Sequence, residues 1–232
     1  MSINQRDLGR DRLKIFIPIK HNSQRVACKN FRILGGEPLY KYALLKYRDF
    51  EVYVDTDSEE IFSELKSDDR FTKVTVYKRE DHLIGDTVSV CDLIKNFILK
   101  FNISDPIVQL HVTSPFLTPE IITEAHKYMR NYDSVVSCTT YNSRFWRKES
   151  YGFCPINHNP VKLQQTQDLP ELFEENSAFY IFNPDVIMDL GNRVGKNPYF
   201  YPIESPMNIV IDKATGKKYY KQRKINAKSK QK

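Results

Sequence analysis

The chain has 232 residues, 41% of them hydrophobic, which suits one compact domain with a single main core. No apolar stretch approaches the ~20 residues of a membrane helix, and the charged N-terminal segment lacks the apolar core of a secretory signal. We therefore expect a cytoplasmic protein that has no membrane partner.

The net charge of +6 is concentrated at one end of the chain. Residues 213–232 hold nine of the 35 Lys and Arg residues and no acid, which leaves 26 basic against 29 acidic residues elsewhere. No second basic patch with interleaved aromatic residues supports nucleic-acid binding. We expect residues 1–212 to form a single domain, residues 213–232 to form a basic, flexible tail, and nucleic acid not to be a partner.

Short β-rich runs alternate with helical patterns along the chain. Strands are predicted at 14–19, 51–55, 73–77, 107–112, 134–138 and 178–182. Helices are predicted at 38–46, after Asp57 or Ser58, at 87–100 with Asp86 as the cap, and at 120–129 after Thr118 and Pro119. This alternation predicts an α/β fold with a Rossmann-like, mainly parallel sheet flanked by helices.

Residues 141–175 interrupt the alternation with polar, proline-bearing sequence that also carries aromatic residues. A long excursion between two core strands is typical of a flap, a hairpin or a subunit contact. We interpret the segment as an insertion into the domain.

The first predicted strand runs into a cationic loop, in the stretch IFIPIKHNSQRVACKN of residues 15–30. The loop lacks the glycine patterns of dinucleotide folds and P-loops, so any phosphate would be held by side chains such as Lys20, Arg25 and Lys29. In open parallel sheets, ligands bind at the carboxyl ends of strands. The loop therefore predicts a polyphosphate site, with a merely solvated loop as the alternative.

Five segments, in one order, carry a family resemblance. They are IPIKHNSQRVACKNFRILGGEPLYKYAL, YVDTDSEEI, KREDHLIGDTVSV, LHVTSPFLT and QQTQDLPELFEENSAFYIF. Together they resemble the sugar-acid cytidylyltransferases, the family of the CMP-N-acetylneuraminate synthetases and, more distantly, the CMP-Kdo synthetases. The resemblance covers roughly residues 14–212.

The resemblance implies a fold of the nucleotide-diphospho-sugar transferase type, with the insertion as a dimerisation and substrate flap. It also implies an enzyme that transfers CMP from CTP to a sugar acid, such as a sialic, legionaminic or Kdo-like acid, and releases pyrophosphate for surface glycan biosynthesis. Mg²⁺ is the implied cofactor, CTP and an acidic acceptor are the implied ligands, and a homodimer is the implied assembly.

The resemblance also implies roles for individual residues. The catalytic residues would be Lys20, Lys29 and Asp212; the nucleotide would be bound by Pro18, Ser23, Arg25, Asn30, Arg79 and Asp86; the acceptor would be bound by His111, Thr113, Ser114, Gln167, Arg144 and Arg147.

The expected metal carboxylate can be placed in two ways. The run NIVIDKAT keeps Asp212 but has Val210 where the family has a first aspartate. A shifted register makes Glu204 the carboxylate instead. Mg²⁺ can be held by one or two carboxylates together with phosphate oxygens, so we expect Asp212 to bind it, with Glu204 as the alternative.

The acceptor residues depart further from the family. Leu117 and Thr166 stand where the family has arginines, and His111 replaces a glutamine. Neither Leu nor Thr can pair with a carboxylate as arginine does. The alternatives to a sugar acid are a non-sugar acceptor, such as a phosphonate or a polyol phosphate, and an inactive nucleotide-binding scaffold. Arg144 and Arg147 could equally belong to a subunit contact, and His111 could be a core histidine.

Overall fold

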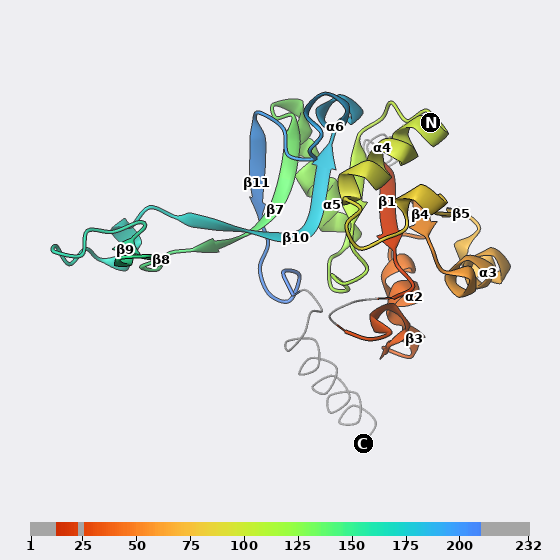
Figure 1. Cartoon of the computed structure of the whole chain (residues 1–232), viewed down its shortest axis with the longest axis horizontal. Coiled ribbons are helices and arrows are strands. Elements are labelled where there is room, and N and C mark those ends of the chain that lie inside the picture. Colours follow the sequence, from red (N-terminus) through yellow and green to blue (C-terminus); the bar gives the residue numbers. More distant parts are fainter. Residues whose placement is uncertain (1–12, 23–25, 210–232) are drawn as a thin grey trace, which may run out of the picture.

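A computed structural model describes residues 13–22 and 26–209. Its centre is a seven-stranded sheet with the strand order β11-β7-β10-β6-β1-β4-β5 (Figure 1). The strands of this sheet are β1 (Lys14–Ile19), β4 (Glu51–Thr56), β5 (Val74–Lys78), β6 (Ile107–Leu110), β7 (Ser134–Tyr141), β10 (Leu172–Phe182) and β11 (Pro198–Pro202). Neighbouring strands are parallel except where β10 pairs antiparallel with β6 and β7. The prediction of a Rossmann-like, mainly parallel sheet is confirmed.

Helices cover both faces of the sheet. They are α2 (Leu39–Leu44), α3 (Glu59–Ser67), α4 (Val90–Phe101), α5 (Pro119–His126) and α6 (Pro184–Leu190), with short 3-10 turns η1 (Lys29–Phe31), η2 (Asp69–Phe71), η3 (Asp81–Leu83), η4 (Lys127–Arg130) and η5 (Thr166–Asp168). On β1, Ile15 and Ile17 join the core that contains α2, α3 and α5, whereas Phe16 joins the core of α4 and α6. The alternating side chains of β1 thus bind the two layers together.

The predicted N-terminal cap is correct for one helix and wrong for another. The Ser58 hydroxyl accepts a hydrogen bond from the Ile61 N–H and caps α3, as predicted. Helix α4 differs, because Ser89 and not Asp86 provides its cap by accepting from the Cys91 N–H. The predicted cap lies three residues early, and Asp86 is left in the preceding loop, where it faces Lys20.

Residues inside the predicted insertion form an arm that extends away from the body (Figure 1). We call residues 142–171 the arm; it contains the hairpin of β8 (Trp146–Glu149) and β9 (Gly152–Pro155) and the turn η5. The ends of β7 and β10 pair beyond the central sheet as a two-stranded ribbon that carries the arm. A second small hairpin, of β2 (Ile33–Leu34) and β3 (Glu37–Pro38), precedes α2.

Within the described part of the chain, every helix is too short or too polar to cross a membrane.

Candidate functional site

The site is set by the order in which the strands enter the sheet. From β1 the chain moves outward through β4 to β5, and it then returns to the other side of β1 as β6. The loops that follow β1 and β6 therefore diverge at the carboxyl edge of the sheet, which is where open α/β sheets bind ligands. Lys20 follows β1 and His111 follows β6, so both predicted site residues lie at this switch in strand order.

The loop after β1 closes on the segment before α4. The Lys20 ammonium donates to the Gly85 carbonyl at 2.7 Å and lies 3.6 Å from the Asp86 carboxylate. The buried Asn30 amide donates to the Lys20 carbonyl at 2.6 Å, which holds the two ends of the loop together. Pro18 lies two residues before Lys20 on β1. The structure thus brings Pro18, Lys20, Asn30 and Asp86 together.

We call residues 20–30 the cradle, within which Ser23 and Arg25 lie outside the described residues. Cys28 has the left-handed φ of 50° and leads directly into η1, whose first residue is Lys29. Asn30 donates from its amide nitrogen to the Lys20 carbonyl, and its predicted place near the cytosine stays a prediction.

Arg79 lies near the start of the cradle and pairs with a buried acid. Its Nε donates to the Asp55 carboxylate, and both side chains are almost completely buried. Burial raises the pKa of Asp55, and the Arg79 charge opposes that rise. Asp57, whose carboxylate is 3.8 Å from Arg79, accepts the His21 backbone N–H at 2.6 Å. In this structure Arg79 therefore supports the start of the cradle, and a direct contact with the nucleotide stays a prediction.

Asp55 and Asp57 are site residues that the sequence reasoning missed. Both belong to the quoted segment YVDTDSEEI, and the alternation of acids at a strand end was the available signal. A buried aspartate needs a cationic or hydrogen-bonding partner, which Arg79 supplies from the neighbouring strand end.

A second hydrogen-bonded group lies at the end of β6. The fully buried Gln109 accepts from Arg193 at 2.6 Å through its side-chain oxygen, and its nitrogen lies 2.8 Å from His111 Nε2. Because a guanidinium only donates, the Gln109 oxygen faces Arg193 and its NH₂ donates to His111. Burial, Arg193 and then Lys29 lower the pKa of His111 to about 4. The imidazole is neutral at pH 7 and carries its proton on Nδ1.

The sequence reasoning also missed Gln109 and Arg193. A glutamine within the short apolar run IVQL was a visible signal, because a buried amide requires partners. Arg193 lies in a loop with no motif, and only the fold brings it to β6.

Thr113 and Ser114 follow His111 in the same loop. The Ser114 N–H donates to the His111 carbonyl at 3.0 Å, and Thr113 is half-buried. The Ser114 hydroxyl is buried, and among the described residues it has no hydrogen-bond partner. These two residues therefore lie where acceptor contacts were predicted, without a contact that tests the prediction.

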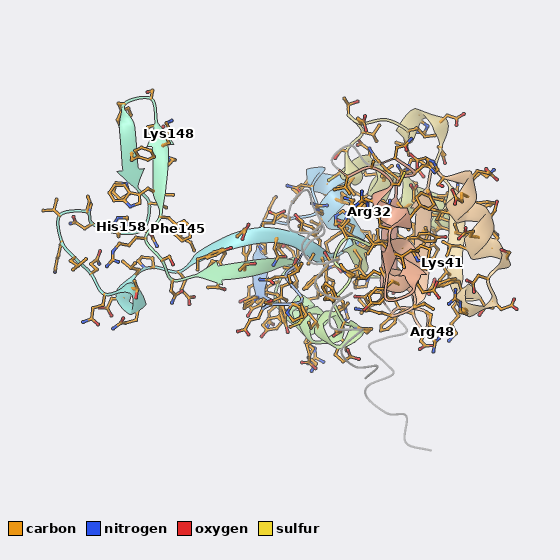
Figure 2. The ribbon with its side chains drawn as sticks, turned by 90° about the horizontal axis from the view of Figure 1, so that it is seen from below. Arg32, Lys41, Arg48, Phe145, Lys148 and His158 are labelled. Carbon is orange, nitrogen blue, oxygen red and sulfur yellow. The ribbon has the colours of Figure 1, made fainter. Side chains whose placement is uncertain are left out.

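Three predicted acceptor residues lie on the arm instead. Gln167 is exposed in η5, Arg144 donates to the Gln164 carbonyl, and Arg147 pairs with Glu149 on the hairpin. Figure 2 shows the hairpin residue Lys148 on the arm, away from the body, and Arg32, which follows the cradle, on the body. Within one chain the structure does not bring these three residues to the cradle.

Of the two predicted metal carboxylates, Glu204 lies within the described residues and Asp212 does not. Val210 and Asp212 lie outside the described residues. Glu204 is exposed just after β11, whose carboxyl end lies at the same edge of the sheet as that of β1, because both strands run in the same direction. Across residues 13–22 and 26–209 no group of three or more His, Cys, Asp or Glu side chains could hold a metal.

Solved structures share this fold. The chain is similar to a structure of CMP:2-keto-3-deoxy-manno-octonic acid synthetase complexed with CTP, with a TM-score of 0.62, 15% identity, and coverage of 94% of this chain and 100% of that one. It is also similar to a 4-diphosphocytidyl-2C-methyl-D-erythritol synthase, with a TM-score of 0.60, 13% identity, and coverage of 90% and 97%. The sheet, its covering helices and these neighbours define a fold of the nucleotide-diphospho-sugar transferase type.

The chain belongs to the cytidylyltransferase family, whose model matches residues 15–231. It is 28% identical over 210 residues to N-acylneuraminate cytidylyltransferase A of Danio rerio, covering 86% of this chain and 48% of that protein. It is 27% identical over 202 residues to CMP-N,N'-diacetyllegionaminic acid synthase of Legionella pneumophila, covering 82% and 83%. The chain thus spans about half the length of the Danio rerio protein, and the expected family membership is confirmed.

Proposed function

We propose that the chain is a CTP-dependent cytidylyltransferase that transfers CMP to a sugar acid and releases pyrophosphate. The observation that carries this proposal is the cationic cradle at the switch in strand order, in a chain of the cytidylyltransferase family. The two relatives are named for N-acylneuraminic acid and N,N'-diacetyllegionaminic acid. Their names support a nine-carbon acid as the first acceptor to test.

In this reaction the protein positions the phosphates and stabilises charge. The oxygen of an acceptor hydroxyl forms a bond to the α-phosphorus, and the bond from that phosphorus to the bridging oxygen breaks. Pyrophosphate leaves with the electron pair, and the hydroxyl proton passes to solvent. Lys20 and Lys29 would bind the triphosphate by charge-assisted hydrogen bonds, joined by Ser23 and Arg25.

Lys20 can turn from its present partners toward a ligand. Its contacts are one carbonyl and a carboxylate at 3.6 Å that is well exposed, so neither holds the ammonium strongly. Phosphate oxygens of a bound nucleotide would offer it more charge than Asp86 does.

Mg²⁺ is the proposed cofactor, and it would neutralise charge that develops on the phosphates. The described residues offer Glu204 as a carboxylate at the correct edge of the sheet but no complete protein cage. That donor set fits Mg²⁺, which keeps several waters and takes oxygens from phosphate. Asp212, or alternatively Glu204, would hold the ion.

We further propose a homodimer in which the arm reaches the site of a second copy. Four apolar or aromatic residues of the arm are largely exposed to solvent: Tyr151 (80%), Phe153 (68%), Val161 (93%) and Leu163 (89%). Their exposure to water is unfavourable, and a partner surface would cover them. Gln167, Arg144 and Arg147 could then contribute to the acceptor site of that copy. We place the reaction in the cytoplasm, where CTP is available, as a step of surface glycan biosynthesis.

The proposal is tested by measuring pyrophosphate release. Mg²⁺ is supplied with CTP, UTP, ATP or GTP, and with N-acetylneuraminic, diacetyllegionaminic, pseudaminic and Kdo acids, a phosphonate and a polyol phosphate as acceptors. We expect release with CTP and one sugar acid, and its loss with EDTA. Lys20→Met should raise the KM for CTP by about tenfold or more, whereas Lys73→Met, at an exposed site before β5, should not.

Other outcomes of the same assay are decisive. Pyrophosphate release with only the phosphonate or the polyol phosphate would show that the acceptor is that compound and not a sugar acid. No release with any pair, despite CTP binding, would favour an inactive scaffold. Comparing Asp212→Asn with Glu204→Gln would identify the metal carboxylate, because only one of the two variants should lose turnover while it still binds CTP.

A further inference from the structure

Arg193 is fixed beside strand β6, next to the hydrogen-bonded pair of Gln109 and His111. It lies in the loop between α6 and β11, and the carbon of its guanidinium is 3.6 Å from the centre of the Tyr180 ring. Its Nη1 donates to Gln109 at 2.6 Å. Tyr180 and Gln109 face each other across the pairing of β10 and β6, and both are completely buried. The guanidinium therefore lies over a buried surface made by two neighbouring strands.

The charge of Arg193 is not neutralised within the described residues. Its two partners there are an amide and a phenol, and burial raises the pKa of Tyr180, so the ring remains uncharged. Within the described part of the chain, Arg193 forms no ion pair with a carboxylate. A guanidinium has five N–H donors in a planar fork, and the one bond to Gln109 leaves others for a ligand. The side chain is half-buried, so a ligand can reach it.

Gln109 links Arg193 to His111, one of the predicted acceptor residues. Arg193 and Lys29 both help to lower the pKa of His111. The Gln109 NH₂ donates to His111 Nε2, so the imidazole carries its proton on Nδ1 and can donate from there. Arg193 and His111 thus present a positive charge and a neutral donor, joined through Gln109, that suit an acidic ligand.

We propose that Arg193 binds the carboxylate of the acceptor acid while His111 donates to a neighbouring acceptor oxygen. This inference rests on the proposed function and deepens it by naming a specificity-determining residue. Neither Leu117, which is buried, nor Thr166, which is exposed on the arm, can take that carboxylate.

The test compares acceptor and nucleotide kinetics in four proteins: wild type, Arg193→Gln, Arg193→Lys and Lys196→Gln. Lys196 lies exposed in the same loop, so its variant removes the same charge from a nearby position. The acceptors are the sugar acid that the wild type uses best and the carboxamide of that acid. Thermal melting and CTP binding show that each variant is folded.

We expect Arg193→Gln to raise the KM for the acid by about 10- to 100-fold, as the loss of a hydrogen-bonded charge pair requires, with the KM for CTP within about twofold of wild type. Arg193→Lys should recover part of the loss, and Lys196→Gln should behave as wild type. The wild type should prefer acid over carboxamide by a similar factor, and Arg193→Gln should lose that preference.

Two results would overturn the role of Arg193: an unchanged KM for the acid, or an equal loss for acid and carboxamide, which a merely structural residue would give. If the wild type releases no pyrophosphate, the proposed function fails separately. Titration of N-acetylneuraminate, diacetyllegionaminate and Kdo in the presence of CTP then decides about Arg193. Binding that Arg193→Gln abolishes supports it, whereas equal binding to both proteins, or binding to neither, refutes it.

Discussion

At the scale of single residues, the Asp55–Arg79 pair links stability to the site. Arg79→Met leaves a buried carboxylate without its cation, so we expect a loss of about 3–5 kcal/mol in the free energy of unfolding, measured with urea. The double variant with Asp55→Asn should recover much of this loss, because the stranded charge is gone. Arg70, whose guanidinium pairs with Asp68 and Glu37 at the surface, provides the control: Arg70→Met should cost far less than Arg79→Met, because solvent screens an exposed ion pair. Equal losses in the two single variants would contradict the argument.

His111 makes stability depend on pH in a defined direction. Its pKa is lowered to about 4 in the folded protein, from 6.5, because burial and two nearby cations disfavour its protonation. Below pH 6.5 the unfolded chain binds a proton that the folded protein does not, so the contribution of His111 to stability falls as the pH drops from 6.5 toward 4. Relative to His111→Gln, the wild type should lose on the order of 2 kcal/mol between pH 7 and pH 4.5. Urea unfolding at several pH values measures this difference, and parallel curves for the two proteins would refute it.

At the scale of elements, contacts within the arm hold it together. The buried Asn157 accepts the Phe145 N–H at 3.0 Å and donates to the Ser143 and Pro170 carbonyls at 2.8 and 3.2 Å. Trp146 packs edge-on against His158. These contacts shape the arm before any partner binds, so its exposed apolar side chains form a preorganised surface.

That surface predicts the oligomeric state. The wild type should elute with a mass about twice 27.3 kDa in size-exclusion chromatography with light scattering. Replacing Phe153, Val161 and Leu163 together by serine should give the mass of a monomer, since it removes the apolar area that a second copy would cover. Leu99→Ser, at a 70% exposed leucine on α4, is the control and should remain a dimer. A monomeric wild type would refute the proposed assembly.

At the scale of the whole molecule, the sequence predicted the central strands of the sheet better than the elements around them. Strand β1 was predicted residue for residue, because its apolar run is bounded by charged residues on both sides. Helix α6, strand β11 and the small hairpin of β2 and β3 were not predicted, because their residues carry little periodicity and tertiary packing decides their structure. The antiparallel course of β10 also follows from the chain path and not from a local signal.

Some residues of the candidate site could likewise be predicted from the sequence, and others could not. Lys20, Asn30, Asp86 and His111 could be selected from sequence, since they belong to continuous motifs beside a strand end. Gln109, Arg193 and the Asp55–Arg79 pair could not be assembled, because each group joins segments 24 to 84 residues apart. Long-range polar contacts leave no periodic pattern, so only the folded arrangement reveals them.

The ribbon that carries the arm also affects how the chain behaves before it meets a partner. Beyond Cys138 strand β7 pairs with β10 alone among the described strands, and the first residues of β10 likewise pair only with β7. Both strands there present backbone edges that no other described strand covers, and such edges are templates for pairing between chains and for aggregation. The exposed Glu174 and Glu175 place negative charge on this stretch. We expect these charges to repel a second ribbon and so to oppose edge-to-edge pairing of newly made protomers.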